Sequence, residues 1–160
     1  MGKNRPMDIS ARTDYAVRAM LSLAAAQVDR TGPVSAEAIA SRQALPKKFL
    51  EAILSDLRRS GLVTSTRGNA GGYALARPAA QISLGDVFRA VDGPLAEVRG
   101  LRPHDMTYQP PADHLPTVWV AVRASLRRVL DETTLAGVLA GELPEHVVAL
   151  SSAPDAWRNR

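Results

Sequence analysis

The sequence has no cysteine among its 160 residues. This absence excludes disulfide bonds, thiolate nucleophiles and cysteine-ligated zinc or iron–sulfur centres. Histidine is also scarce, and none of the three histidines stands in a recognisable catalytic motif. No glycine-rich loop opens a helix as a phosphate-binding loop does. The pattern therefore does not favour an enzyme.

Long apolar runs are missing as well. No stretch approaches the ~18 apolar residues that a membrane-spanning helix needs. The opening residues, MGKNRPMDIS, lack the apolar core of a signal peptide. We therefore expect a cytoplasmic protein without a membrane partner. Its length predicts one domain with an extension, large enough to bury its own core.

Positive charge is concentrated in the first part of the chain. Residues 1–93 contain 13 basic and 8 acidic side chains, whereas residues 94–160 contain 7 and 8. Local positive charge attracts phosphates and gives salt-sensitive affinity for nucleic acid. Charge alone fits a solvated surface equally well, so the choice depends on the local pattern.

The stretch 44–75 predicts an amphipathic helix followed by a hairpin. Apolar residues recur at spacings of three and four on one helical face, namely Leu50, Ile53, Leu54 and Leu57. Pro46 suits a first helical turn and Gly61 suits the left-handed residue that ends a helix, so we place the helix at 46–60. The charged residues occupy the opposite face.

The period changes after Gly61. Residues 62–66 and 73–76 are compatible with strands, and the glycine-rich stretch 67–72 between them permits positive φ angles. This predicts a hairpin with Arg67 at its tip. A helix that begins with lysines and is followed by such a hairpin has the layout of a winged helix, which contacts both DNA grooves.

Three more helices are predicted from serine caps and the apolar pattern that follows each cap. They include residues 15–26, 36–42 and 84–91, preceded by Ser10, Ser35 and Ser83 respectively. The first is apolar on nearly all sides and should be buried. The second forms a helix-turn-helix with the helix at 46–60.

Residues 96–116 have no consistent period, and loops of this length are usually functional or disordered. The loop contains His104, Asp105 and His114, whose side chains can bind transition metals or simply decorate a mobile loop. A long helix at about 118–131 then carries an apolar seam of Trp119, Val122, Leu126 and Val129. This helix either folds back on the domain or pairs with a second copy, and we favour the dimer.

The expected fold is mainly α with a small β-wing. We divide it into a loose N-terminal arm (1–7), a winged helix-turn-helix DNA-binding domain (8–95), a variable sensor-type loop (96–116) and two C-terminal parts. These are a dimerisation helix with a short helical segment (117–150) and a tail (151–160).

Four blocks of this sequence resemble the Rrf family of bacterial winged-helix regulators. They are SARTDYAVRAML at 10–21, LEAILSDLRRSGLV at 50–63, RGNAGGYAL at 67–75 and ISLGDVFRAVDGPL at 82–95. The resemblance covers roughly residues 8–95 and extends more loosely to the long helix. It implies a homodimer that binds a palindromic operator in double-stranded DNA, usually as a repressor.

The resemblance also implies which residues contact DNA. The family's recognition-helix contacts fall on Lys47, Lys48, Phe49 and Glu51, and its wing contacts fall on Arg67 with the adjoining Gly68 and Asn69. Lysine can donate to guanine and glutamate can accept from cytosine, while arginine suits a narrow minor groove. Phe49 departs from the tyrosine often found in the family, and it either touches a thymine methyl or packs.

The larger departure concerns sensing. Cluster-binding members of the family place three cysteines in the loop after the VDGPL block, so we expect no iron–sulfur cofactor and no bound metal of that kind here. Asp14 aligns with a carboxylate ligand of some nitric-oxide sensors, although an acid near a helix N-terminus also has an electrostatic reason. Two alternatives stay open. The loop senses a metal, small molecule or partner protein, or the winged helix is a protein-interaction module.

Overall fold

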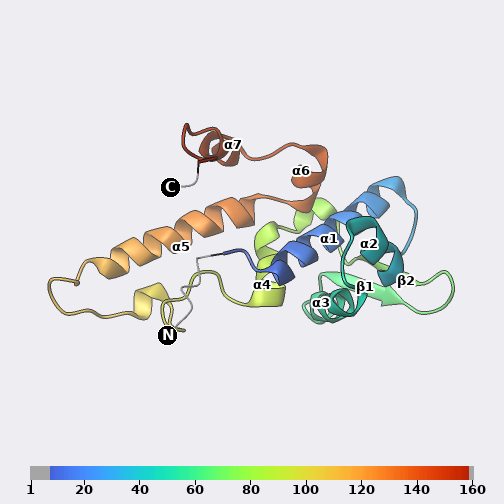
Figure 1. The fold of residues 1–160 in the computed structure, drawn as a ribbon, viewed down its shortest axis with the longest axis horizontal. Coiled ribbons are helices and arrows are strands. Elements are labelled where there is room, and N and C mark those ends of the chain that lie inside the picture. Colours follow the sequence, from blue (N-terminus) through green and yellow to red (C-terminus); the bar gives the residue numbers. More distant parts are fainter. Residues whose placement is uncertain (1–7, 159–160) are drawn as a thin grey trace.

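The structure is a computed structural model that describes residues 8–158. The elements are α1 Ala11–Asp29, α2 Ala36–Gln43, α3 Lys47–Arg59, β1 Val63–Thr66, β2 Gly72–Leu75, η1 Ala79–Gln81, α4 Leu84–Asp92, η2 Pro103–Asp105, α5 Leu115–Glu132, α6 Leu135–Ala140 and α7 Glu145–Ser151. The first four α-helices and the hairpin gather at one end of the molecule, and α5 extends away from them (Figure 1). The expected mainly helical fold with a small β-wing is confirmed. The predicted arm at 1–7 lies outside the described residues.

Helix α1 lies at the centre of the core. Its side chains Ala16, Ala19 and Met20 are completely buried, and α1 contacts α3, α4, α6 and β2. Small side chains let neighbouring helices approach closely, which explains why α1 is flanked on several sides. The Ser10 side chain accepts a hydrogen bond from the Thr13 N–H and begins the helix. The burial of these core side chains confirms the predicted burial of the helix.

Helices α2 and α3 form the expected helix-turn-helix. Ser35 begins α2 by accepting a hydrogen bond from the Ala38 N–H, and the left-handed Ala44 ends it with φ 52°. Pro46 lies just before the first turn of α3 and not within it. The Leu62 N–H donates to the Leu57 carbonyl at 2.9 Å, so the chain turns at Gly61 as predicted.

The wing is an antiparallel pair in which Val63 lies opposite Leu75 and Thr66 lies opposite Gly72. Val34 adds a third segment, because it exchanges two backbone hydrogen bonds of 2.8 Å with Tyr73. A single paired residue has no periodic signal, so the sequence did not indicate this contact. The close pairing requires glycine at position 72, where φ is +146° and a Cβ would lie 2.5 Å from the Val34 carbonyl carbon.

Helix α4 begins at the predicted Ser83 cap, which forms a capping box with Asp86. The Ser83 hydroxyl accepts from the Asp86 N–H, and the Asp86 carboxylate accepts from the Ser83 N–H. At its other end, Asp92 accepts hydrogen bonds from the hydroxyls of Ser10 and Thr13. The end of α4 therefore fixes the beginning of α1.

Helix α6 belongs to the core of the winged helix. Leu135 is fully buried there, and its N–H donates to the Ile82 carbonyl at 2.9 Å. The Leu84 N–H donates in turn to Thr133 at 2.8 Å. The expected division groups this segment with the dimerisation helix. A six-residue apolar helix does not reveal its packing partner in its own sequence, whereas the structure shows it against α1 and η1.

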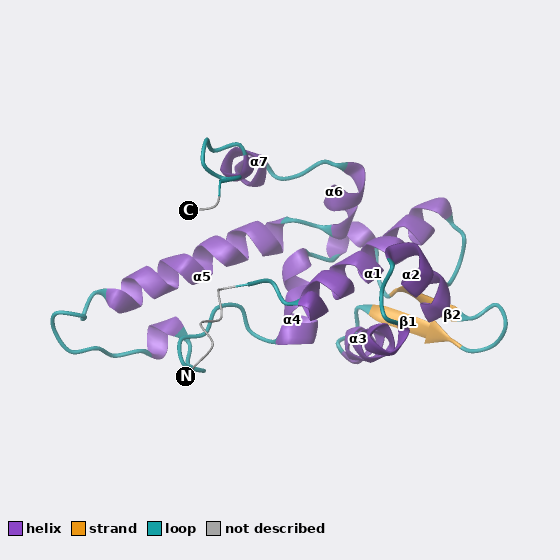
Figure 2. Cartoon of the chain, in the orientation of Figure 1, coloured by secondary structure: helices purple, strands orange, loops and turns teal. Residues whose placement is uncertain are grey.

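The predicted loop 96–116 is mostly irregular but contains η2, which packs against α5. Pro103 and Met106 are buried at this contact, and α5 begins at Leu115, slightly earlier than expected. The cartoon shows the loop returning alongside α5 (Figure 2). Within residues 8–158, no helix combines the length and apolar character needed to cross a membrane.

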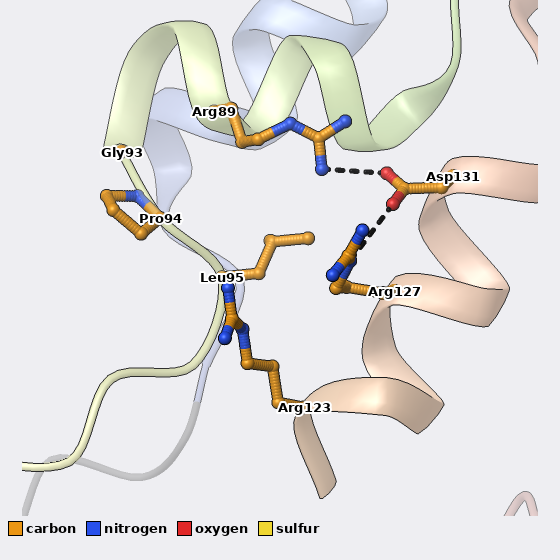
Figure 3. A pocket seen from close by; sticks show the side chains of 7 residues that line it. All are labelled: Arg89, Gly93, Pro94, Leu95, Arg123, Arg127 and Asp131. Atoms are coloured by element: carbon orange, nitrogen blue, oxygen red, sulfur yellow. Dashed lines mark hydrogen bonds and ion pairs between the residues drawn. The ribbon is translucent and has the colours of Figure 1, made fainter. Parts of the chain in front are cut away.

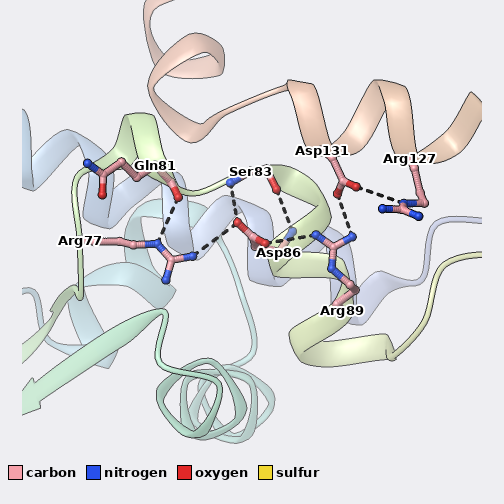
Figure 4. A network of polar contacts seen from close by, with 7 residues as sticks. All are labelled: Arg77, Gln81, Ser83, Asp86, Arg89, Arg127 and Asp131. Atoms are coloured by element: carbon pink, nitrogen blue, oxygen red, sulfur yellow. Dashed lines mark hydrogen bonds and ion pairs between the residues drawn. The ribbon is translucent and has the colours of Figure 1, made fainter. Parts of the chain in front are cut away.

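A polar network joins the base of the wing to α4 and α5 (Figure 4). Asp86 lies 3.5 Å from Arg77 and 3.1 Å from Arg89. Arg89 reaches Asp131 of α5 at 2.8 Å, and Asp131 also contacts Arg127 at 3.4 Å. The network therefore joins three segments, and α5 lies far from the other two in sequence.

Ionisation of the network follows from its contacts. Burial opposes the charge of Asp86, but hydrogen bonds from Ser83 and Arg89 outweigh it and hold the pKa of this carboxyl below its usual range. Burial likewise opposes the charge of Arg89, yet hydrogen bonds to Asp131 and Asp86 raise its pKa. Both groups stay charged at neutral pH.

Replacement of Gly72 by alanine should lower the free energy of unfolding by about 2–3 kcal/mol, because the new Cβ strains φ and meets Val34. Urea denaturation measures the change. Gly32→Ala is the matched control, since Gly32 has φ +83° but open space around it. Equal losses in the two variants would contradict a role for the Val34 contact.

Asp86→Asn should destabilise the protein by about 1 kcal/mol at pH 7, because a helix cap and exposed ion pairs usually contribute stability of this size. The pKa of Asp86 is lower in the folded protein than in the unfolded protein, where it is near 3.8. Ionised Asp86 therefore stabilises the fold above this pH, and the stabilisation is lost as the pH falls through the pKa of the folded state. The difference from wild type should therefore shrink below about pH 4. Chemical denaturation from pH 7 to pH 3 checks this, with the exposed Asp29→Asn as control. A difference that stays constant over this range would refute the ionic contribution.

Candidate nucleic-acid interface

Helix α3 presents a charged face to solvent because its apolar stripe is fully buried. Lys47, Lys48 and Glu51 are exposed at its beginning, while all four predicted stripe residues are buried. Pro46 provides no side-chain cap, and the first turn contains no acid. The N–H groups of this turn are thus open to an anion and reinforced by the helix dipole.

The two lysines differ in their surroundings. Lys47 is paired with Glu37 of α2, and this hydrogen bond is the main reason that the pKa of Lys47 is raised. Lys48 has no ion pair with any described residue. A phosphate would therefore meet Lys48 free but would have to compete with Glu37 for Lys47.

Phe49 packs against α1, which is one of the two alternatives expected for it. Its ring meets Tyr15 edge-on, with centroids 6.0 Å apart, and Arg18 lies 5.9 Å from the Tyr15 centroid. The Phe49 side chain is nevertheless 47% exposed. It packs against α1 and still offers an apolar surface for contact.

The tip of the wing carries Arg67, Gly68 and Asn69, all exposed. Gly68 has φ +105°, and a Cβ at Gly71 would lie 2.2 Å from the Thr66 carbonyl oxygen. The tight loop therefore depends on its glycines. It projects beyond α2 and α3 as a free end of the molecule (Figure 1).

Two arginines fix these elements through contacts that the sequence did not indicate. Arg58 of α3 donates to the Ser65 hydroxyl of β1 at 3.1 Å and joins the helix to the wing. Arg12 of α1 pairs with Asp56 of α3 and also donates to the Val91 carbonyl at 3.3 Å. Each pair bridges residues from different elements, so no local motif marks it.

The residues predicted for the dimer seam are all half-buried within one chain: Trp119, Val122, Leu126 and Val129. Leu126 and Val129 line an apolar hollow of about 500 Å³ together with Phe88 and Leu95. Val118 is 50% exposed, one turn before Val122. Part of the seam therefore faces α4 and part stays accessible.

The residues predicted for effector binding form local pairs. Asp14 contacts Arg18 at 3.3 Å, His104 contacts Asp105 at 3.5 Å, and His114 contacts Asp113 at 3.7 Å. Within residues 8–158, no three histidine or acidic side chains converge as a metal site. The structure does not gather the predicted residues into one site.

Comparisons with known proteins agree with this architecture. The family model described as Rrf2, iron-dependent transcriptional regulator, matches residues 9–141. An HTH-type transcriptional regulator of Mycobacterium tuberculosis is 50% identical over 145 residues, covering 91% of this chain and 89% of that protein. The CymR regulator of Bacillus subtilis is 36% identical over 129 residues, covering 81% and 87%.

Solved structures give the same result. The structure of B. subtilis CymR, described as the global cysteine regulator, has a TM-score of 0.71 at 33% identity and covers 85% of this chain and 98% of that one. The structure of T. potens IscR has a TM-score of 0.68 at 36% identity, with coverage of 84% and 88%. These relatives are transcriptional regulators rather than enzymes. The chain belongs to the Rrf2 family of winged-helix DNA-binding transcriptional regulators.

Proposed function

We propose that the protein is a homodimeric repressor that binds a palindromic operator and carries no iron–sulfur cluster. The observation that carries this proposal is the joint exposure of the basic start of α3 and the arginine-tipped wing on one tightly packed core. Double-stranded DNA offers both a groove wide enough for a helix and phosphates that attract the basic side chains. Such a regulator acts where the bacterial chromosome lies, in the cytoplasm.

Helix α3 would enter the major groove. Lys47 and Lys48 can donate to guanine or phosphate, and Glu51 can accept from a cytosine amino group. The uncapped N–H groups of the first turn supply a further phosphate contact. The exposed part of Phe49 suits a thymine methyl group.

The wing would reach the adjacent minor groove. Arg67 stands at a tip that the glycines at 68 and 71 hold in a narrow turn. Insertion of arginine is favoured where the minor groove is narrow and its potential is most negative. Gly68 and Asn69 lie at the same tip and would pass along the phosphates.

Helix α5 would supply the dimer contact. It extends from the domain and has no fully buried residue in the single chain. Val118, Val122 and Val129 share one side of the helix, at spacings of four and seven, and Val129 lines the apolar hollow. A second α5 packed there would bury this side and place two copies of α3 for a two-fold site.

The proposed absence of a cluster rests on ligand chemistry. Iron–sulfur clusters are held by cysteine thiolates, and this chain has none. The segment between α4 and α5 instead buries Pro103 and Met106. Packing by these side chains gives the segment a structural role that needs no metal.

Sequencing of genomic fragments retained by the purified protein at physiological salt tests the function. A shared palindrome is the expected result. Retention of all fragments alike, lost on a modest rise in salt, would refute sequence-specific regulation.

Arg67→Ala should weaken binding to the operator by about 1–3 kcal/mol, because one minor-groove contact is lost. Fluorescence anisotropy at fixed ionic strength measures the affinity. Arg102→Ala removes an equal charge from the exposed loop before η2 and should bind as wild type. Equal affinity of Arg67→Ala and wild type would reject the role of the wing.

Val118→Glu should raise the dimer dissociation constant at least about tenfold, because a charge would be buried against the partner. Val118 is half exposed in the single chain, so the change should leave the monomer folded. Sedimentation velocity over a concentration series provides the measurement. Val120→Glu is the control, since Val120 is similarly exposed but lies on a different side of α5. Identical dimerisation of both variants would contradict the proposed seam.

A further inference from the structure

A basic hollow lies between the end of α4 and the last turns of α5 (Figure 3). Its volume is about 420 Å³, within the range of small-molecule sites. Three arginines and one aspartate line it, together with the turn formed by residues 93–95. Arg89 comes from α4, whereas Arg123, Arg127 and Asp131 follow one another at successive turns of α5.

The positive charge of this hollow is only partly compensated. Asp131 contacts Arg89 at 2.8 Å and Arg127 at 3.4 Å, so each of its two oxygens lies within ion-pair distance of a guanidinium group. Arg89 also contacts Asp86 and is therefore held by two carboxylates. Arg123 is half-buried, and no carboxylate pairs with it within residues 8–158. A partly buried cation without a counterion favours binding of an anion.

We propose that this hollow is an effector site for a small organic anion that bears a carboxylate or phosphate group. The anionic group would bind the planar guanidinium forks of Arg123 and Arg127, which present donors one helical turn apart. Leu95, whose side chain points into the hollow between the arginines, would contact the apolar part of the ligand. The turn at Gly93 and Pro94 closes one wall.

The place of the hollow gives the ligand a regulatory role, a step that rests on the proposed function. The ligand would contact α4 of the winged helix and α5 of the dimer at once. An anion bound to Arg127 competes with Asp131, which also pairs with Arg89. Arg89 contacts Asp86 in turn, and Asp86 contacts Arg77 at the base of the wing. Occupancy would thereby shift the packing of α4 on α5 and change the spacing of the two α3 helices.

Isothermal titration calorimetry on the full chain without DNA tests the site directly. The probes are inorganic phosphate, succinate and citrate, each at constant ionic strength, so that the phosphate and carboxylate arms are compared. At least one probe should bind saturably with a dissociation constant below about 1 mM, which corresponds to roughly 4 kcal/mol. Arg123→Gln should weaken this binding tenfold or more.

Arg128→Gln is the matched control. It removes the same charge from a residue further along α5, which is exposed and does not line the hollow. This variant should bind the probe as wild type does. The site would be refuted if no probe bound saturably, or if both variants weakened binding equally.

A second measurement separates the site from the function. The bound probe should change operator affinity about fivefold in wild type, which is the lower end of the usual range of allosteric coupling. It should not change operator affinity in Arg123→Gln. Probe binding without any operator binding would refute the proposed function and leave the site standing. Probe binding with unchanged operator affinity would refute the regulatory step alone.

Discussion

Close packing around α1 is the constraint on which the rest of the molecule depends. The alanines at 16 and 19 present almost no side chain, so α3 and α4 can approach the α1 backbone closely. The ion pair of Arg12 with Asp56 then fixes α3 against the same helix. The charged face of α3 is thus directed outwards by the core, and its exposure is a consequence of what α1 buries. Larger side chains at these positions would displace the surface proposed to contact DNA.

The sequence predicted most of the fold because its signals are local. Serine caps, the leucine stripe of α3 and the glycines of the wing each act within a few residues. Family resemblance added the residues expected to contact DNA, and the structure places them on exposed parts of α3 and the wing. Their roles in binding stay predictions.

What could not be predicted depends on contacts between distant segments. The pairing of Val34 with Tyr73 and the burial of Leu135 under Ile82 leave no periodic pattern. The same holds for the basic hollow, since Arg89 and Arg123 are brought together only when α5 packs on α4. Gly85 leaves room for the Asp131 carboxylate, because a Cβ there would lie 1.9 Å from an Asp131 oxygen. The histidines and the aspartate predicted in the loop follow from chemical type, and Asp14 follows from the family resemblance, whereas the hollow is defined by the packing of helices.

The pairing of Lys47 with Glu37 has a consequence for how such a protein would move along a chromosome. A phosphate that binds Lys47 must first displace an internal carboxylate, so every encounter with DNA begins from a partly neutralised surface. Contacts with DNA outside the operator would therefore be shorter lived than the number of lysines on the helix implies. A regulator with this internal competitor would be held less strongly on DNA outside its operator.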